Sequence, residues 1–289
     1  MAFVDLHLHT TASDGRLSPS ELVIYLDQRG VKIAAITDHD STEGLPEALA
    51  AGEEFPHLTL IPGVELSTDV PGGEIHMLGY FLSWRDQGFQ ETLGEFRRGR
   101  VGRAQGMVEK LAELGMKVEW ERVQELAGDG AVGRPHVARA MMERGYVAEF
   151  REAFDKYIGR NGPAYVERKK LLTVDAIGLI REAGGAAVLA HPTWVDDLET
   201  HLGPLKEAGL AGMEVHYGSY SPDVVVDLAQ LAQRYDLIPC GGSDYHAMGA
   251  GGEAQPGDQG PPEKSVEELW ARATNPEESG STWAPSPAP

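Results

Sequence analysis

Short apolar runs alternate with longer amphipathic segments over most of the chain. The short runs have the length of β-strands, and the longer segments repeat their apolar positions with the period of an α-helix. Ser18, Pro19 and Glu21 form a serine N-cap, a first-turn proline and a capping-box glutamate, which together predict a helix start. The predicted strands lie at 3–10, 32–37, 58–64, 74–82, 186–189, 212–215 and 237–240, and the predicted helices that alternate with them lie at 19–30, 43–50, 174–183, 198–208 and 221–235.

Two stretches depart from this alternation. Residues 89–170 read as consecutive helices without a strand, at 93–114, 120–126, 135–144 and 149–158. Residues 249–289 form an acidic tail rich in Pro and Gly, which we expect to be disordered apart from a short helix at 266–273. The turn sequence Pro71-Gly72-Gly73 predicts that strands 58–64 and 74–82 form a hairpin.

The alternation of strands and helices predicts an α/β fold with a largely parallel sheet. About seven strand and helix units favour a closed or distorted β/α barrel over an open sheet. We therefore expect residues 1–88 and 171–248 to form the barrel and residues 89–170 to form an all-helical insertion that covers the substrate.

The formal net charge of −20 argues against a protein that grips long nucleic acid duplexes with its general surface. A phosphate-bearing ligand would need a local positive feature. The amino terminus has no basic segment followed by an apolar run, and no apolar run approaches the roughly 20 residues of a membrane span. We therefore expect a cytoplasmic protein that has no contact with membranes.

Imidazole and carboxylate side chains follow the predicted strands. His7 and His9 are two residues apart on a strand, so both imidazoles face the same side. In a barrel, residues that follow the strands gather at one end. His76 lies early in its strand, as the antiparallel neighbour of a parallel strand would place it. The candidate ligands are His7, His9, Asp14, His39, Glu65, His76, His191, Asp244 and His246.

These donors are too many for a single ion. Nitrogen and carboxylate ligands without thiolates fit manganese, iron or zinc better than calcium, and Glu65 could bridge two ions. Bound divalent ions lower the pKa of coordinated water and neutralise charge on a phosphoryl group. Phosphate ester hydrolysis is therefore the expected reaction class, with amide or lactone hydrolysis second.

The motifs H-x-H, T-D-H-D, G-V-E-L-S, I-H-x-L-G-Y, A-H-P and G-S-D-Y-H, together with Asp14, resemble the polymerase and histidinol phosphatase (PHP) family over residues 3–248. This resemblance implies a distorted, TIM-like (β/α)7 barrel with three divalent ions, manganese being expected and iron or zinc being alternatives. It assigns one ion to His7, His9, Glu65 and Asp244, a second to Glu65, His76 and His191, and a third to Asp14, His39 and His246.

The helical insertion narrows the resemblance to one subgroup of the PHP family. Arg134 and His136 stand where a helix begins, and a helix start favours anions. The alternative is an ordinary helix start with an exposed arginine. This motif in a helical insertion resembles PHP proteins that act on nucleoside 3',5'-bisphosphates and on the 5' ends of short RNA or DNA. By this resemblance, Arg134 and His136 would hold the phosphate that is not cleaved.

The leading hypothesis is a metal-dependent phosphoesterase that releases the 3'-phosphate of a nucleoside 3',5'-bisphosphate and also shortens small oligonucleotides from the 5' end. The leaving oxygen could be protonated by a metal-bound water, by Asp244 or by His246. Histidinol phosphate hydrolysis is a second enzymatic hypothesis. A non-catalytic binding or scaffold protein is an alternative of another class.

Two features leave alternatives open. The arginines of residues 97–103 could guide an oligonucleotide or form a solvated helix face. Glu214, at the end of a predicted strand, could support the metal ligands or be a surface carboxylate.

Overall fold

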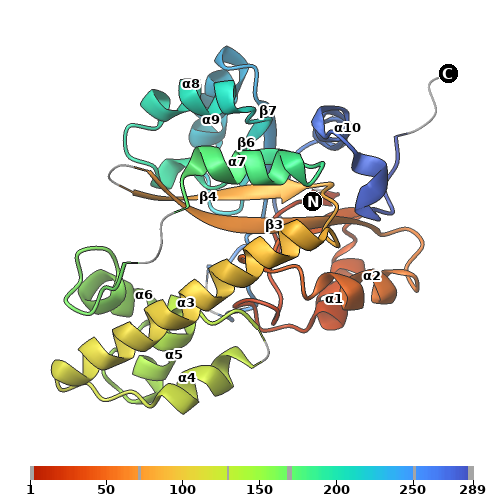
Figure 1. Ribbon diagram of the computed structural model, residues 1–289. Coiled ribbons are helices and arrows are strands. Elements are labelled where there is room, and N and C mark those ends of the chain that lie inside the picture. The colour runs from red at the N-terminus through yellow and green to blue at the C-terminus, as the bar shows by residue number, and fades with distance from the viewer. Residues whose placement is uncertain (1–2, 71–72, 129, 168–170, 250–251, 286–289) are drawn as a thin grey trace.

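The computed structural model describes residues 3–70, 73–128, 130–167, 171–249 and 252–285 (Figure 1). In the described part of the chain, seven strands pair in sequence order into one sheet. Strand β4 is antiparallel to both of its neighbours, and the other pairs are parallel. The strands are β1 (Val4–Asp5), β2 (Ile33–Ile36), β3 (Thr59–Val70), β4 (Gly73–Tyr80), β5 (Ala186–Leu189), β6 (Gly212–Tyr217) and β7 (Ile238–Gly242).

The first and last strands meet, which closes the sheet into a barrel. The amide of Leu6 donates to the carbonyl of Gly241 at 3.2 Å, and the amide of Asp244 donates to the carbonyl of His7 at 2.9 Å. The predicted distorted β/α barrel of seven strands is therefore confirmed. The same contacts fix the ends of β1 and β7 side by side, where the candidate ligands lie.

Strand β3 is longer than the sequence predicts. It pairs with β2 in its first half and continues antiparallel to β4 in its second half. Glu65 therefore lies inside a strand, and the expectation that it follows the end of one is wrong. The antiparallel pairing of β3 and β4 confirms the hairpin, whereas its predicted turn at Pro71-Gly72 lies outside the described residues.

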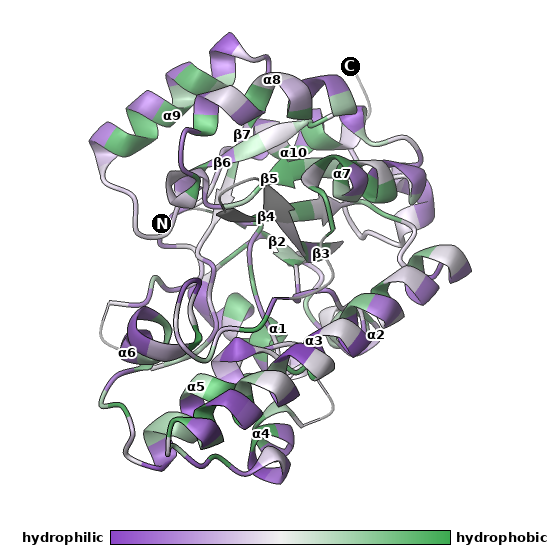
Figure 2. Cartoon of the chain, turned by 60° about the vertical axis from the view of Figure 1, so that its left-hand side comes forward, coloured by the Kyte–Doolittle hydropathy of each residue, from purple (hydrophilic) through white to green (hydrophobic). Residues whose placement is uncertain are grey.

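Helices surround the barrel, and their green and purple faces in Figure 2 show the expected amphipathic character. Ser18 accepts a hydrogen bond from the amide of Glu21, so the predicted capping box is present. The helices that follow barrel strands are α1 (Pro19–Arg29), α2 (Leu45–Gly52), α7 (Thr173–Glu182), α8 (Leu198–Ala208) and α9 (Pro222–Arg234). A short 3-10 turn, η2 (Pro192–Trp194), follows β5.

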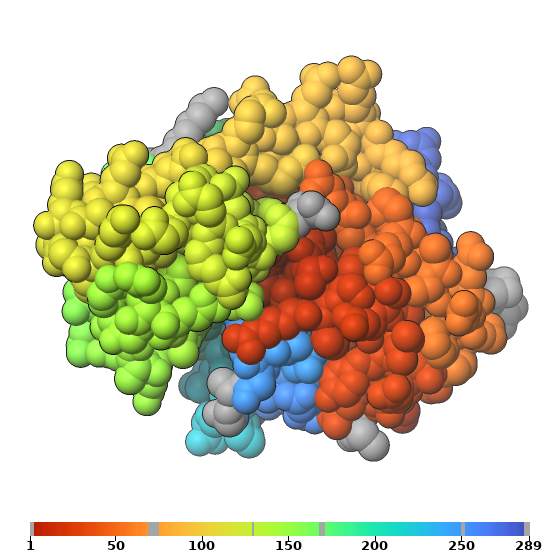
Figure 3. All heavy atoms as spheres, turned by 90° about the horizontal axis from the view of Figure 1, so that it is seen from below, coloured from red at the N-terminus to blue at the C-terminus, as the bar shows by residue number. Residues whose placement is uncertain are grey.

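The segment between β4 and α7 is helical, as predicted. Its helices form one lobe beside the amino-terminal part of the barrel (Figure 3, yellow to green). Buried side chains of this lobe, among them Met107, Val137 and Ile158, form a hydrophobic cluster separate from the clusters of the barrel. The elements are α3 (Gln87–Glu113), α4 (Trp120–Ala127), α5 (Arg134–Glu143), α6 (Phe150–Ala153) and a π-helical turn, η1 (Phe154–Ile158), which replaces the end of the predicted helix at 149–158.

The carboxyl-terminal segment is not disordered where the structure describes it. Helix α10 (Glu263–Arg272) and a 3-10 turn, η3 (Pro276–Ser279), pack against the barrel. Val266, Leu269 and Trp283 are buried in the cluster that fills the barrel interior. The expectation of disorder is wrong for residues 252–285, because a few apolar side chains anchor a segment whose average composition is polar.

Within the described residues, none of the helices has both the length and the apolar character that crossing a bilayer requires.

Candidate metal centre

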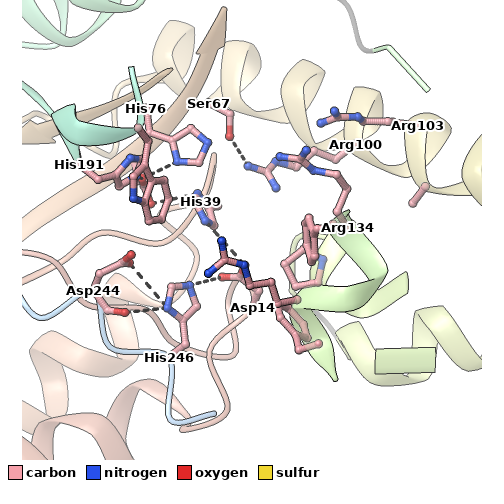
Figure 4. Close-up of a pocket in the computed structure, with 18 residues that line it drawn as sticks. Asp14, His39, Ser67, His76, Arg100, Arg103, Arg134, His191, Asp244 and His246 are labelled. Atoms are coloured by element: carbon pink, nitrogen blue, oxygen red, sulfur yellow. Dashed lines mark hydrogen bonds and ion pairs between the residues drawn. The ribbon is translucent and has the colours of Figure 1, made fainter. Parts of the chain in front are cut away.

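The predicted ligands converge at one end of the barrel. His7 and His9 follow β1, His39 follows β2, and Asp244 and His246 follow β7. Figure 4 shows His39, His76, His191, Asp244 and His246 directed toward one cavity, with Asp14 at its base. Residues that are up to 239 positions apart thus face one another, because the strand ends of a barrel share one rim.

The first ligand group consists of His7, His9, Glu65 and Asp244. Nε2 of His7 lies 3.2 Å from Glu65 Oε2 and 3.2 Å from Asp244 Oδ1. Nε2 of His9 lies 3.2 Å and 3.1 Å from the same two oxygens. Atoms that each bind one ion at about 2.0 to 2.2 Å are separated by roughly 3 Å, so this spacing suits a shared cation.

Glu65 presents its two oxygens to different histidines. Oε2 faces His7, His9 and His39, whose Nδ1 is 3.1 Å away. Oε1 lies 2.7 Å from Nδ1 of His76 and 3.2 Å from Nε2 of His191. A carboxylate with ligands on both sides has the arrangement of a bridge between two ions.

The third predicted group is also assembled. Nε2 of His246 lies 3.3 Å from Asp14 Oδ1, and Nε2 of His39 lies 3.7 Å from Asp14 Oδ2. His9 joins this group through its other ring nitrogen, Nδ1, which is 3.8 Å from Asp14 Oδ1. The group around His76 contains His39 and Glu65, where the prediction has His191 in place of His39, and Nε2 of His191 lies 3.2 Å from Glu65 Oε1.

Unsatisfied polar atoms support metal binding. Among the described residues, both ring nitrogens of His9 and Nδ1 of His39 are buried and make no hydrogen bond, although carboxylate oxygens lie close to them. Buried polar atoms are nearly always hydrogen-bonded, since an unpaired one costs about 1 to 3 kcal/mol. Imidazole nitrogens beside carboxylate oxygens, with no thiolate, are the donors that first-row divalent ions accept. The residues present therefore fit divalent metal ions.

The close packing of imidazoles and carboxylates shifts the pKa values of these side chains. Burial lowers the pKa of His39 to about 3, despite the carboxylates of Glu65 and Asp14. Burial acts the same way on His246, but Asp14 and Asp244 raise its pKa to about 10. The pKa of Glu65, which burial alone would raise, is held well below its usual range by His39, His7 and His76. The carboxylates therefore favour positive charge at the centre of the cluster.

Glu214 supports the ligands from behind. This fully buried carboxylate lies 3.0 Å from Nδ1 of His7 through Oε1 and accepts the amide of His191 at 2.7 Å through Oε2. With Nδ1 of His7 donating to Glu214, the Nε2 lone pair faces the first ligand group. The alternative of a surface carboxylate is wrong for Glu214, and so is the expectation that it ends a strand, because β6 continues to Tyr217.

Further polar side chains also hold the candidate ligands in place, among them Tyr217 outside the quoted motifs and Asp38 within T-D-H-D. The hydroxyl of Tyr217 donates to Asp244 Oδ2 at 2.7 Å. Asp38 accepts the hydroxyls of Thr10 and Ser13 at 2.7 Å each. These bonds fix the loops that carry the ligands after β1 and β2.

The cavity above the ligands has a volume of about 380 Å³ and an opposite wall rich in arginine. Figure 4 shows Arg100, Arg103 and Arg134 entering from α3 and α5, across from the histidines. The guanidinium of Arg100 pairs with Asp40 and donates to Ser67, which joins the insertion to the barrel. The run at 97–103 therefore contributes to the cavity wall as well as to the helix surface.

Arg134 and His136 occupy different positions. Arg134 lines the cavity, with its guanidinium 5.6 Å from the ring centre of Phe154. His136 is buried, its Nδ1 accepts the amide of Gly133 at 3.0 Å, and it is not among the residues that line the cavity in the described chain. His136 therefore stabilises the start of α5, and its predicted contact with phosphate stays a prediction.

Comparison with known proteins shows which family has this architecture. The model of the PHP domain matches residues 5–158. The chain belongs to the PHP domain family. This PHP chain is 38% identical to the 5'-3' exoribonuclease Rnm of Salmonella typhimurium over 253 residues, which are 84% of each protein.

Two other relatives cover nearly the whole PHP chain. The 3',5'-nucleoside bisphosphate phosphatase of Chromobacterium violaceum is 35% identical over 257 residues, 87% of this chain and 90% of the relative. A crystal structure from Bifidobacterium adolescentis, described as a metal-dependent phosphoesterase, superposes with a TM-score of 0.85 at 28% identity, covering 93% of this chain and 96% of that one. The insertion and the barrel are therefore both shared with these relatives.

Proposed function

We propose that this protein is a metal-dependent phosphoesterase that releases the 3'-phosphate of nucleoside 3',5'-bisphosphates and shortens small oligonucleotides from their 5' ends. The observation that carries the proposal is one cavity with a cage of imidazoles and carboxylates on one side and arginines on the other. Such a cavity suits a molecule with two separate phosphates. The names of two relatives, a bisphosphate phosphatase and a 5'-3' exoribonuclease, agree with this substrate class.

The proposal assigns three divalent ions, with manganese expected, to the ligand groups around Glu65 and Asp14. Divalent ions bound there would supply an activated water nucleophile and neutralise charge that develops on the phosphoryl group. The chain's own contribution is to hold the donors in place before the substrate arrives. Glu214 and Tyr217 do this by fixing the rings and carboxylates from behind.

The second phosphate would bind at the arginine wall. The side chain of Arg134 reaches the cavity from the start of α5, where the helix dipole also favours an anion. A guanidinium binds phosphate through two parallel hydrogen bonds, so it fixes orientation as well as position. Arg134 would thus place the 3'-phosphate of the same nucleotide against the cage, with His136 holding the helix start.

Asp244, His246 and a metal-bound water stay the candidates for delivering a proton to the leaving oxygen. Both side chains line the cavity. Burial would raise the pKa of Asp244, but His7, His9 and His246 hold it far below its usual range. Burial acts against the charged form of His246, but Asp14 and Asp244 raise its pKa.

The phosphate anchor is tested with Arg134→Ala. We expect KM for adenosine 3',5'-bisphosphate to rise about 10-fold to 100-fold, because a charge-assisted bidentate contact contributes roughly 1.5 to 3 kcal/mol. Hydrolysis of p-nitrophenyl phosphate, which has no second phosphate, should change little. Phosphate release in the presence of Mn²⁺ measures both reactions.

The matched control is Arg139→Ala, which removes an arginine from the same helix that does not line the cavity in the described structure. It should leave both substrates unaffected. Equal losses on both substrates in Arg134→Ala would contradict the anchor role.

A further inference from the structure

Trp194 is a large aromatic side chain left open to solvent at the rim of the cavity. Its exposed fraction is 61%, and it lines the same cavity as Arg134 and the ligand histidines. An exposed tryptophan is unremarkable by itself. What distinguishes Trp194 is that its indole lies beside the metal ligands and is held rigidly.

Hydrogen bonds hold the backbone of the turn η2, which carries Trp194. The amide of Trp194 donates to the carbonyl of His191 at 3.0 Å. The amide and hydroxyl of Thr193 donate to the hydroxyl of Tyr220 at 3.3 Å and 3.0 Å. The position of the indole is therefore set before any ligand binds, which lowers the entropy cost of using it as a binding surface.

One face of the indole is already covered. The imidazole of His191 stacks on it with ring centres 4.0 Å apart and an angle of 30°. The ring of Tyr217 meets it edge-on at 6.0 Å. No other ring in the described part of the chain stacks on the indole, and Trp194 is 61% exposed, which leaves room for a planar ligand on the second face.

The distances fit a nucleotide. Nε2 of His191 lies 3.2 Å from Glu65, so the stacked pair extends outward from the ligand cage. A ring on the outer face of Trp194 would lie roughly 4 to 5 Å beyond the indole, as stacked aromatic rings do. A base stacked there would lie on the side of the indole away from His191, and the arginine wall that would bind the other phosphate lines the same cavity as Trp194.

We propose that Trp194 is the platform on which the nucleobase of the substrate stacks. This inference rests on the proposed function, and it adds that the enzyme recognises the presence of a base. Stacking uses the face of the ring, which every base possesses, so all four nucleotides would be accepted and purines would bind more tightly than pyrimidines. Substrates with two phosphates but no base would lose this contact.

The experiment compares adenosine 3',5'-bisphosphate with methyl β-D-ribofuranoside 3,5-bisphosphate, which keeps the sugar and both phosphates. Base stacking contributes enough that Trp194→Ala should raise KM for the adenosine substrate about 10-fold or more. The methyl riboside should change less than about two-fold. Trp194→Phe should recover most of the binding, whereas Trp194→Leu, which still covers His191 with apolar atoms, should behave like the alanine variant.

A binding measurement separates this inference from the proposed function. Adenosine 5'-phosphate, which has no 3'-phosphate to lose, should quench the tryptophan fluorescence of the native protein, and ribose 5-phosphate should not. The quenching should be largely absent in Trp194→Phe. If the native protein hydrolyses neither bisphosphate, the proposed function fails, and this quenching still decides the role of Trp194.

Equal losses on both bisphosphates in Trp194→Ala would show that the indole only supports His191 and would overturn the proposal. Unchanged KM values for both substrates, or quenching that persists in Trp194→Phe, would overturn it as well.

Discussion

Single side chains behind the ligands determine how well the metal centre is formed. Glu214 touches both His7 and His191, so it controls two ligands from different strands. The motifs identified side chains that converge at the candidate metal centre, because strand alternation and strand ends fix where those side chains point. They could not reveal Tyr217 or Trp194, since contacts between residues far apart in sequence depend on the packed barrel.

Glu214→Gln tests this support. The single carbonyl oxygen of a glutamine can accept from only one of the two groups that Glu214 satisfies, so either His7 or the backbone of His191 would lose its partner. Loss of such a supporting partner typically lowers metal affinity about 10-fold to 100-fold. Equilibrium dialysis with Mn²⁺ measures the change, and Glu207→Gln on the exposed face of α8 is the control. Unaltered affinity in Glu214→Gln would contradict the role.

The burial of His136 predicts that the free energy of unfolding depends on pH in the acidic range. Burial lowers the pKa of His136 from 6.5 to about 4, so the unfolded chain binds a proton between pH 6.5 and pH 4 that the folded chain does not. The free energy of unfolding should therefore fall as the pH drops through this range, by about 2 kcal/mol at pH 5 from this residue.

His136→Gln removes that titration and keeps a capping-box acceptor for the amide of Gly133. Urea unfolding of metal-stripped protein at pH 7 and pH 5 should show a smaller loss for the variant than for the native chain. Parallel losses in both proteins would exclude His136 as a contributor.

At the scale of helices and strands, local signals predicted most elements. The capping box at Ser18 predicted where α1 begins, and the apolar run at 186–189 predicted β5. The length of β3 and the order of the tail were not predicted, because both depend on partners that are distant in sequence. Strand β3 continues to Val70 because β4 pairs with it. Helix α10 is ordered because Leu269 and Trp283 are buried against apolar side chains of the barrel.

The packing of α10 is tested with Leu269→Ala. Leu269 is 1% exposed, and truncating a buried leucine typically costs about 2 to 5 kcal/mol of unfolding free energy. Urea unfolding of the metal-stripped protein measures the loss. Glu267→Ala, on the exposed side of the same helix, should change stability by less than about 0.5 kcal/mol. If both variants behave alike, the segment does not pack as described.

At the scale of the whole molecule, the barrel and the helical insertion both contribute side chains to the cavity. The barrel gathers ligands from many strands at one rim, and the insertion supplies arginines in a chain whose net charge is −20. The barrel could be predicted from alternation and motif order. The shape of the cavity between the two parts could not, because it arises from how the insertion packs onto the rim.

The central claim is that this cage is a divalent metal site which hydrolyses phosphate esters. The most direct test is to strip the protein with a chelator, titrate it with Mn²⁺, and follow both bound metal and phosphate release from adenosine 3',5'-bisphosphate. We predict that the stripped protein releases no phosphate and that activity returns as Mn²⁺ occupies the ligand groups. Full Mn²⁺ binding without hydrolysis of any phosphate ester, or unchanged turnover after stripping, would contradict the account.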